Sequence, residues 1–214
     1  MKSIICIFSK TPGVSKVKTR LAKSIGHERA QEFFKKSVDL TLSEVKNLSH
    51  DYVVAVAEDT TEAHEYWREH NIINQVSGSL GHKLDGVYKE YIDKYHSVFF
   101  IGADSPHLNF SDLSLKINEF NESSFDYLLG EAQDGGYYIF GGKKELDLND
   151  WLQVPYSASN TSEEFKKVLG DSIMSLPIDF DIDDIEDLKT LKKLDSSRLS
   201  ASQKSFIAWL NDKF

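Results

Sequence analysis

The residues best suited to chemistry begin with one carboxylate, Asp104. It follows a short apolar run, Val98–Ile101, whose β-branched and aromatic residues predict a buried strand. Gly102 and Ala103 are small enough to let a ligand approach the backbone, and Pro106 ends the strand because it fixes φ and lacks an N–H. A carboxylate just past the carboxyl end of a strand, with no Lys or Arg nearby, suits a hard divalent cation. The alternative is that Asp104 caps a turn.

Four cations gather between a predicted first strand, Ile4–Ser9, and a predicted helix that begins near Lys18. They are Lys10, Lys16, Lys18 and Arg20. Backbone N–H groups at the start of a helix favour an anion, and Lys and Arg side chains together could hold a diphosphate. A solvated basic loop is the alternative, and the glycine spacing of a Walker loop is missing.

Two adjacent glycines, Gly135 and Gly136, lie within the stretch EAQDGGYYIF. They permit backbone angles closed to other residues and would let a substrate lie against the main chain. Tyr137 and Tyr138 fall on opposite faces of the strand that follows, so one of them could stack on a sugar or base. Asp134 is a candidate catalytic base or acceptor for a substrate hydroxyl. The alternative is an ordinary Asp-Gly hairpin turn.

An acidic segment near the C-terminus, DFDIDD at positions 179–184, offers further carboxylates. Asp181 and Asp183 alternate with apolar residues, so in an extended segment both face the same side. They could complete a metal site begun by Asp104. The alternative is that Asp183, together with Glu186, starts a helix.

Composition restricts the class of protein. The chain has 214 residues, 40% apolar and 28% charged, which predicts one packed domain over residues 1–214. A formal net charge of −9 argues against nucleic acid as a partner, because phosphate backbones are held by Lys and Arg. A single cysteine, Cys6, excludes an internal disulfide. Without a targeting segment or a long apolar run, we expect a cytoplasmic protein with no membrane insertion.

Apolar periodicity predicts strands that alternate with helices through the first half, as in a parallel sheet. The predicted strands are Ile4–Ser9, Tyr52–Ala57, Ile72–Val76, Val98–Ile101, Asp126–Gly130, Tyr137–Phe140 and Met174–Leu176. The two strands around the paired glycines suggest an antiparallel addition at one edge. Capping boxes are predicted at Thr161 with Glu164 and at Ser200 with Gln203.

These segments together resemble a bacterial family of nucleotide-diphospho-sugar transferases of the GT-A type, often labelled glycosyltransferases of arsenosugar-biosynthesis type. The resemblance spans nearly the whole chain. The matching stretches are FSKTPGVSKVKTRLA (Phe8–Ala22), SGSLGHKL (Ser77–Leu84), IGADSPHL (Ile101–Leu108), GEAQDGGYYIFG (Gly130–Gly141), VPYSASNT (Val154–Thr161) and DIDDIEDL (Asp181–Leu188). Guanylyltransferases that act on 2-phospho-L-lactate are related in fold and have a similar KTRL-like beginning.

The resemblance implies a single Rossmann-like GT-A domain, an α/β fold with a mostly parallel mixed sheet flanked by helices. It implies that Lys18 and Arg20 lie beside the nucleotide phosphates, and that Asp104 coordinates the metal. It also implies that the DGGY stretch lies beside the acceptor or sugar. The chain departs from the family pattern at Val14-Ser15, usually Pro-Gly, and at Ser79, usually Asp.

We therefore expect a metal-dependent glycosyltransferase that uses a nucleoside diphosphate sugar and a small-molecule acceptor. Mg²⁺ or Mn²⁺ would be held by Asp104, Asp181 and Asp183, with Lys10 joining the nucleotide site. Asp134 would be the base if the reaction inverts. The alternative enzyme is a nucleotidyltransferase that joins a nucleoside triphosphate to a small phosphorylated substrate and releases pyrophosphate. A third hypothesis is a non-catalytic sensor of nucleotide sugars; the oligomeric state stays open.

Overall fold

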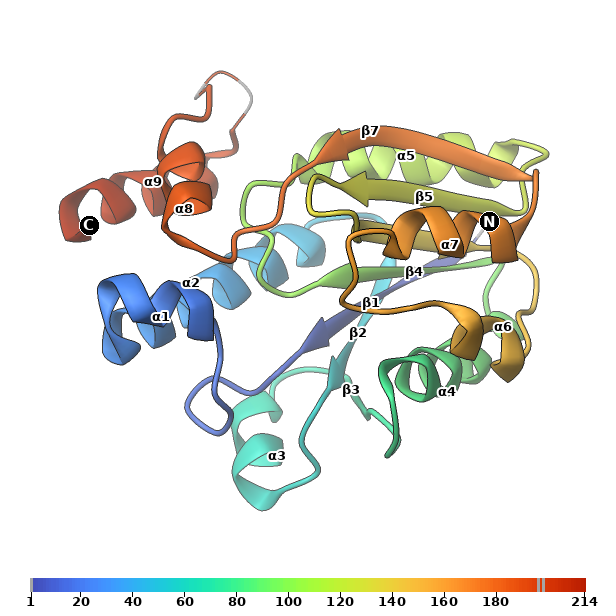
Figure 1. The fold of residues 1–214 in the computed structure, drawn as a ribbon, viewed down its shortest axis with the longest axis horizontal. Helices are drawn as coiled ribbons and strands as arrows, with labels where there is room; N and C mark the ends of the chain where they lie inside the picture. The colour runs from blue at the N-terminus through green and yellow to red at the C-terminus, as the bar shows by residue number, and fades with distance from the viewer. Residues whose placement is uncertain (1, 196, 198) are drawn as a thin grey trace.

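Seven strands form one sheet in the computed structural model, which describes residues 2–195, 197 and 199–214 (Figure 1). The strands are β1 (Ser3–Ser9), β2 (Asp51–Val56), β3 (Ile72–Asn74), β4 (Ser97–Gly102), β5 (Tyr127–Ala132), β6 (Tyr137–Gly142) and β7 (Ile173–Asp179). Their order across the sheet is β3-β2-β1-β4-β6-β5-β7. The chain builds outward from β1 through β2 to β3 and then crosses back to place β4 on the other side of β1. The carboxyl ends of β1 and β4 therefore meet at a topological switch point, where α/β sheets bind ligands.

The strand pairing confirms a mixed, mostly parallel sheet but corrects the position of its antiparallel strand. β6 pairs antiparallel with both β4 and β5, so it lies inside the sheet, and β7 forms the edge in parallel with β5. Burial explains the difference. Ile139 and Phe140 of β6 are both fully buried, as an interior strand requires. β7 is mostly exposed or half-buried and contains Pro177, which an edge strand tolerates because one side of it needs no N–H donor.

Nine helices occupy the described part of the chain. They are α1 (Thr19–Ile25), α2 (His27–Lys46), α3 (Thr61–Trp67), α4 (Leu80–Ile92), α5 (Phe110–Glu122), α6 (Leu148–Gln153), α7 (Thr161–Leu169), α8 (Ile185–Lys192) and α9 (Ala201–Lys213). The sequence prediction missed α6, which has six residues and begins with a capping box of two aspartates, Asp147 and Asp150. None of the described helices is long and apolar enough to cross a membrane.

Alternation along the strands sends side chains into two separate cores. One core packs α2, α3 and α5 against the face that carries Ile5 and Ile7. The other packs α4, α6 and α7 against the face that carries Ile4 and Cys6. A third cluster joins α1, α8 and α9 to the outer side of α2, and Figure 1 shows these helices grouped to one side of the sheet. The helices of the third cluster bring two segments to the same end of the sheet. One is the basic loop, residues 10–20, and the other is the acidic segment, residues 179–184.

The capping predictions have mixed outcomes. Ser200 and Gln203 form the predicted box at the start of α9. The predicted box at α7 is wrong: Asn160 is the N-cap residue, and the hydroxyl of Thr161 instead donates to the Pro155 carbonyl at 2.7 Å. At α8 the capping residue is Asp184.

Candidate functional site

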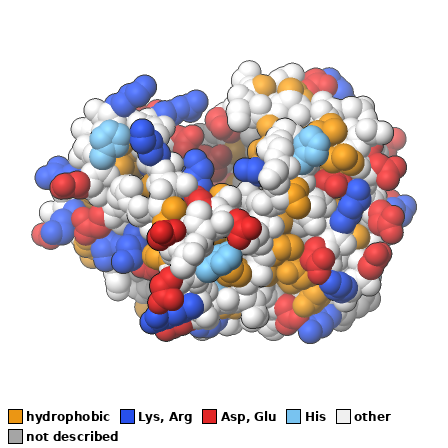
Figure 2. Space-filling model, turned by 90° about the horizontal axis from the view of Figure 1, so that it is seen from below, with side chains coloured by type: hydrophobic (Ala, Val, Ile, Leu, Met, Phe, Trp, Pro, Cys, Tyr) orange, Lys and Arg blue, Asp and Glu red, His pale blue; other side chains and the backbone are white. Residues whose placement is uncertain are grey.

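Two adjoining cavities open at the switch point. The first has a volume of about 380 Å³ and the second about 260 Å³, and Phe8 and Leu80 line both. Figure 2 views the molecule from the side of α3 and α4 and shows it hollowed between two lobes, with acidic and basic side chains close together around the hollow. The first cavity lies beyond β1, and the second reaches the ends of β4 and the start of β6.

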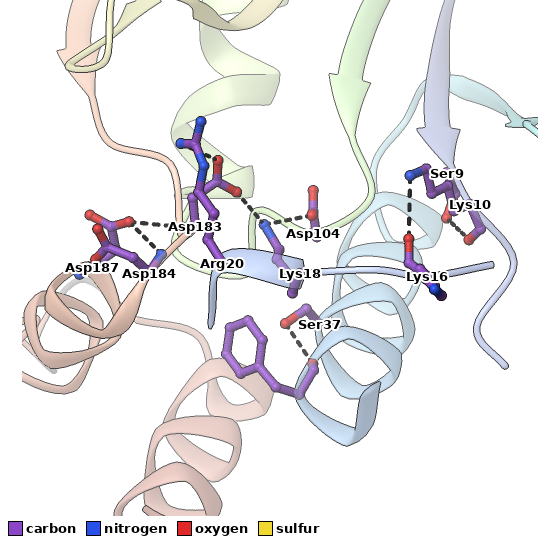
Figure 3. Close-up of polar contacts among 11 residues, drawn as sticks. Ser9, Lys10, Lys16, Lys18, Arg20, Ser37, Asp104, Asp183, Asp184 and Asp187 are labelled. Carbon is purple, nitrogen blue, oxygen red and sulfur yellow. Dashed lines mark hydrogen bonds and ion pairs between the residues drawn. The ribbon is translucent and has the colours of Figure 1, made fainter. Parts of the chain in front are cut away.

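The Lys18 ammonium joins Asp104, beyond β4, to Asp183 of the acidic segment (Figure 3). Its Nζ lies 2.8 Å from Oδ2 of Asp104 and 3.2 Å from Oδ1 of Asp183. The Lys18 side chain is 8% exposed, against 30% for Asp104. Burial disfavours the charge on Lys18, but the two carboxylates outweigh it and raise the pKa of the ammonium. Burial likewise opposes ionisation of Asp104, yet Lys18 outweighs that effect and lowers the pKa of the carboxyl.

The basic loop holds Lys18 in a strained backbone conformation. Lys18 has φ 45° and ψ 47°, the left-handed region that non-glycine residues rarely adopt, and it precedes α1 without a side-chain cap. The loop is anchored at Thr11, whose N–H and hydroxyl both donate to Oε2 of Glu58, at 2.8 and 2.7 Å. Trp67 Nε1 donates to the same hydroxyl at 2.9 Å. This buried anchor fixes the start of the loop, and the sequence analysis did not identify it.

Asp183 is free to face the basic loop because its neighbour performs the capping. Oδ1 of Asp184 accepts hydrogen bonds from the N–H groups of Glu186 and Asp187 at the start of α8. The alternative role predicted for Asp183, capping a helix with Glu186, is therefore wrong. Arg20 lies farther out, with 3.7 Å between its Nη1 and Oδ2 of Asp183.

The other two cations of the loop differ in position. Lys10 lines the first cavity, and its Nζ donates to the backbone carbonyl of Lys16 at 3.3 Å. The Lys16 side chain is exposed and lines neither cavity. Of the four predicted cations, the structure brings Lys18 and Arg20 to the acidic segment and Lys10 to the cavity.

The stretch with paired glycines forms the hairpin between β5 and β6, which confirms the local alternative. Oδ1 of Asp134 accepts from the N–H of Gly136 at 2.8 Å. Gly135 has φ +88°, and a Cβ there would lie 1.9 Å from the carbonyl oxygen of Ser159. The N–H of Ser162 donates to the Gly135 carbonyl at 2.8 Å, so the hairpin is held closely against the start of α7. The hairpin still reaches the site, because Asp134 and Gly136 line the second cavity.

The two tyrosines lie on opposite faces of the sheet, as predicted. The Tyr138 hydroxyl donates to the Pro177 carbonyl at 3.0 Å, and the Tyr137 ring packs against Phe165 with 5.4 Å between centroids. Both tyrosines contribute to the second cavity. Tyr156 also lines it with a buried hydroxyl that has no hydrogen-bond partner among the described residues.

Asp181 and Asp134 are the acidic residues that line the second cavity. Burial, and then the carboxylates of Asp134 and Asp104, raise the pKa of Asp181 to about 7. No Lys or Arg is among the described residues that line this cavity. The first cavity, by contrast, is lined by Lys10, Lys18 and Lys83 together with Asp104 and Asp183.

The carboxylates suit a divalent cation as partial ligands. Within the described residues, no group of three or more His, Cys, Asp or Glu side chains is placed to hold a metal ion unaided. Burial, and then the nearby carboxylates of Asp134 and Asp104, raise the pKa of Asp181, so a cation bound beside it would favour its ionised form. Mg²⁺ commonly binds through one or two carboxylates, completed by water and substrate phosphates. Asp104, with Asp181 or Asp183, fits that type of site.

Lys83 and Gln75 line the first cavity, but the sequence analysis gave neither a role. In the sequence, a lysine on the polar face of an amphipathic helix looks the same whether it contacts solvent or a binding site. Packing of α4 against β4 is what brings Lys83 to the cavity.

The comparisons with known proteins agree with this architecture. No curated protein sequence matches the chain. A crystal structure from Desulfovibrio desulfuricans G20, provisionally described as a nucleotide-diphospho-sugar transferase, has a TM-score of 0.81 and 24% identity, with 98% of this chain and 99% of that chain covered. A cytidylyltransferase from Leptospira borgpetersenii has a TM-score of 0.56 and 18% identity over 99% of this chain and 94% of that one.

A third similar structure is a metal complex. It is Rv0371c of Mycobacterium tuberculosis H37Rv with manganese, which has a TM-score of 0.52 and 11% identity over 89% of this chain and 97% of that one. The chain thus has the fold of nucleotide-diphospho-sugar transferases. Residues 41–158, more than half of the sequence, match the family model DUF2064, described as "Uncharacterized protein conserved in bacteria", and the protein belongs to that family.

Proposed function

We propose that this protein is a metal-dependent glycosyltransferase that uses a nucleoside diphosphate sugar. The observation that carries the proposal is that the described lysines of the site line only one of the two adjoining cavities. The first is lined by three lysines and two aspartates, whereas the second combines two carboxylates with hydroxyl groups and has no described Lys or Arg. A nucleoside diphosphate sugar has the same asymmetry, since its diphosphate is anionic and its sugar is a neutral polyol.

The first cavity binds and orients the diphosphate. Lys10 and Lys83 reach it from the basic loop and from α4, and ammonium groups form charge-assisted hydrogen bonds to phosphate oxygens. Lys18 lines the same cavity, where its ammonium contacts the carboxylates of Asp104 and Asp183. A divalent cation, Mg²⁺ or Mn²⁺, held by Asp104 with Asp181 or Asp183, would help to neutralise the charge that builds on the leaving diphosphate.

The second cavity binds the sugar and the acceptor hydroxyl. Carboxylates accept hydrogen bonds from sugar hydroxyls, protein hydroxyls both accept and donate them, and aromatic rings pack against the apolar faces of a sugar. Asp134 is the candidate general base, because it lies at this cavity on a hairpin whose turn is held by hydrogen bonds. A phosphorylated or carboxylated group would meet Asp134 and Asp181 there, with no described Lys or Arg lining the cavity to balance its charge.

The second candidate is a nucleotidyltransferase. Its support is the fold shared with a cytidylyltransferase. The charge of the second cavity makes this reaction less suitable, because a small phosphorylated acceptor needs Lys or Arg around its phosphate.

The two reactions release different products. The protein is incubated with Mn²⁺ or Mg²⁺ and either a panel of nucleoside diphosphate sugars or a panel of nucleoside triphosphates with phosphorylated acceptors. We expect nucleoside diphosphate to be released from the sugar nucleotides. Release of pyrophosphate from the triphosphates alone would establish the second candidate and overturn the first. Thermal stabilisation by sugar nucleotides without turnover would indicate a sensor.

A further inference from the structure

We propose that Lys18 occupies the position of the divalent cation when the enzyme is empty, and that it must leave the carboxylates before that cation binds. The inference rests on the proposed function, because it assumes a cation site at Asp104. It adds a form of regulation to that site: a tethered ammonium that competes with the metal.

The competition follows from distances. The Lys18 ammonium lies 2.8 Å from Oδ2 of Asp104 and 3.2 Å from Oδ1 of Asp183, so it bridges the two carboxylates (Figure 3). A divalent cation approaches carboxylate oxygens to about 2.0–2.6 Å. An ion that bound the same two oxygens would therefore overlap the space of the ammonium, and their like charges would repel. The two cations therefore cannot occupy this pair of oxygens at the same time.

Lys18 differs from the other cations of the loop because it is buried between the two carboxylates. Its side chain is 8% exposed, whereas Arg20 is 74% exposed and lies 3.7 Å from Asp183. Lys10 donates to a backbone carbonyl rather than to a carboxylate. Without Lys18, Asp104 would have no Lys or Arg within salt-bridge distance among the described residues and Asp183 would keep only the exposed Arg20, so the ammonium stabilises the empty site.

The structure also provides a place for the displaced ammonium. Lys18 and Asp104 both line the first cavity, where the proposed diphosphate binds. The flexible stem of a lysine can carry its charge from carboxylate oxygens to phosphate oxygens there. The left-handed backbone of Lys18 is strained, and such strain is often found at functional sites.

A consequence is that metal and diphosphate should bind cooperatively. Only the fraction of enzyme in which Lys18 has left the carboxylates can bind the metal. The apparent affinity for metal therefore falls as the fraction that still holds Lys18 there rises. A diphosphate attracts Lys18 away and so frees the site, and removal of Lys18 has the same effect without diphosphate.

The test measures Mn²⁺ binding by calorimetry, with no substrate and no turnover. We expect Lys18→Met to bind Mn²⁺ at least about tenfold more tightly than the unchanged protein. Inorganic pyrophosphate should tighten Mn²⁺ binding by a larger factor in the unchanged protein than in Lys18→Met. Lys18→Gly is a second variant, because glycine accepts the left-handed backbone and should fold even if methionine does not.

Lys16→Met is the matched control, since it removes one positive charge from the same loop at an exposed side chain that lines neither cavity. We expect it to change the Mn²⁺ dissociation constant less than about twofold. Equal tightening in Lys16→Met and Lys18→Met would overturn the inference, because the effect would then be general electrostatics. Unchanged binding in both Lys18 variants would overturn it as well.

Asp104→Asn separates this inference from the proposed function. If Asp104→Asn loses Mn²⁺ binding but the Lys18 variants bind as the unchanged protein does, the metal site stands and the competition is wrong. If Asp104→Asn binds Mn²⁺ as the unchanged protein does, the assigned metal site itself is wrong, and the inference fails with it.

Discussion

The two cavities share one edge of one sheet, yet they are built in different ways. The first is formed largely by loops that follow parallel strands, and it holds three flexible lysines beside Asp104 and Asp183. The second is built on the antiparallel hairpin, whose turn contacts α7 at backbone level and whose charges are short aspartates. The comparison suggests a division of work. The first cavity can adapt to a mobile diphosphate, whereas the second holds its carboxylates in fixed positions.

Asp104 lines the first cavity two residues after Gly102, which lines the second, and it is the proposed metal ligand, so its loss should have the largest effect. We expect Asp104→Asn to lower kcat for glycosyl transfer by roughly a hundredfold or more, the magnitude typical for loss of one charge-stabilising group. The fold should persist, because the carboxylate is 30% exposed. Steady-state kinetics and thermal melting would measure both effects. Asp93→Asn, an exposed carboxylate at the end of α4, is the control, and equal losses in the two variants would remove the assignment.

The rigidity of the second cavity can be tested at its hairpin. We expect Gly135→Ala to lower the free energy of unfolding by roughly 2–4 kcal/mol, because its Cβ would meet the Ser159 carbonyl oxygen and because φ is +88°. Gly13→Ala is the control: its φ is +84°, but no atom lies within 4 Å of a Cβ there. That variant should cost only about 1 kcal/mol. Denaturant unfolding gives both values, and similar losses would mean that the hairpin yields more easily than its contacts indicate.

The adaptable first cavity should lose affinity rather than turnover when one of its lysines is removed. We expect Lys83→Met to raise KM for the sugar nucleotide about tenfold with little change in kcat, since one charge-assisted contact to phosphate is lost. Lys89→Met is the control on the same helix, because that lysine pairs with Asp85 at 3.0 Å outside both cavities. A fall in kcat with unchanged KM would instead place Lys83 among the groups that act in the transition state.

The smallest effect concerns the pH dependence of stability. The pKa of the Asp181 carboxyl is raised from 3.8 to about 7, so between these values the folded protein binds a proton that the unfolded chain does not. Stability contributed by this group therefore falls as pH rises through that range. Asp181→Asn should remove the cost of ionising this buried carboxyl. The melting temperature of the variant, relative to that of the unchanged protein, should rise from about pH 4 to about pH 7 and stay constant above that.

Thermal melts of both proteins across pH 4–8 would test this. A gain that does not change with pH would mean that Asp181 titrates normally and that the second cavity is less acidic than its residues suggest.

Local sequence determined much of the fold. Continuous apolar runs predicted β1, β2 and β4, and three- and four-residue periodicity predicted α2, because these patterns depend on neighbours along the chain. The place of Asp104 beyond β4 follows from the same apolar pattern. The hairpin alternative at Gly135 and the capping box at α9 follow instead from local residue types. The types of residue along the chain were enough to select the basic loop and the acidic segment as site candidates.

Only the tertiary structure decided how these segments meet. Lys18 and Asp183 are 165 residues apart, and no local pattern could pair them. The interior position of β6 depended on which strand could be buried on both faces, and the roles of Thr11 and Lys83 depended on packing against β2, α3 and β4. Hydrophobic periodicity specifies which face of an element is buried but not which element covers it. Contacts between distant side chains are therefore set by the packing of the whole sheet and its helices.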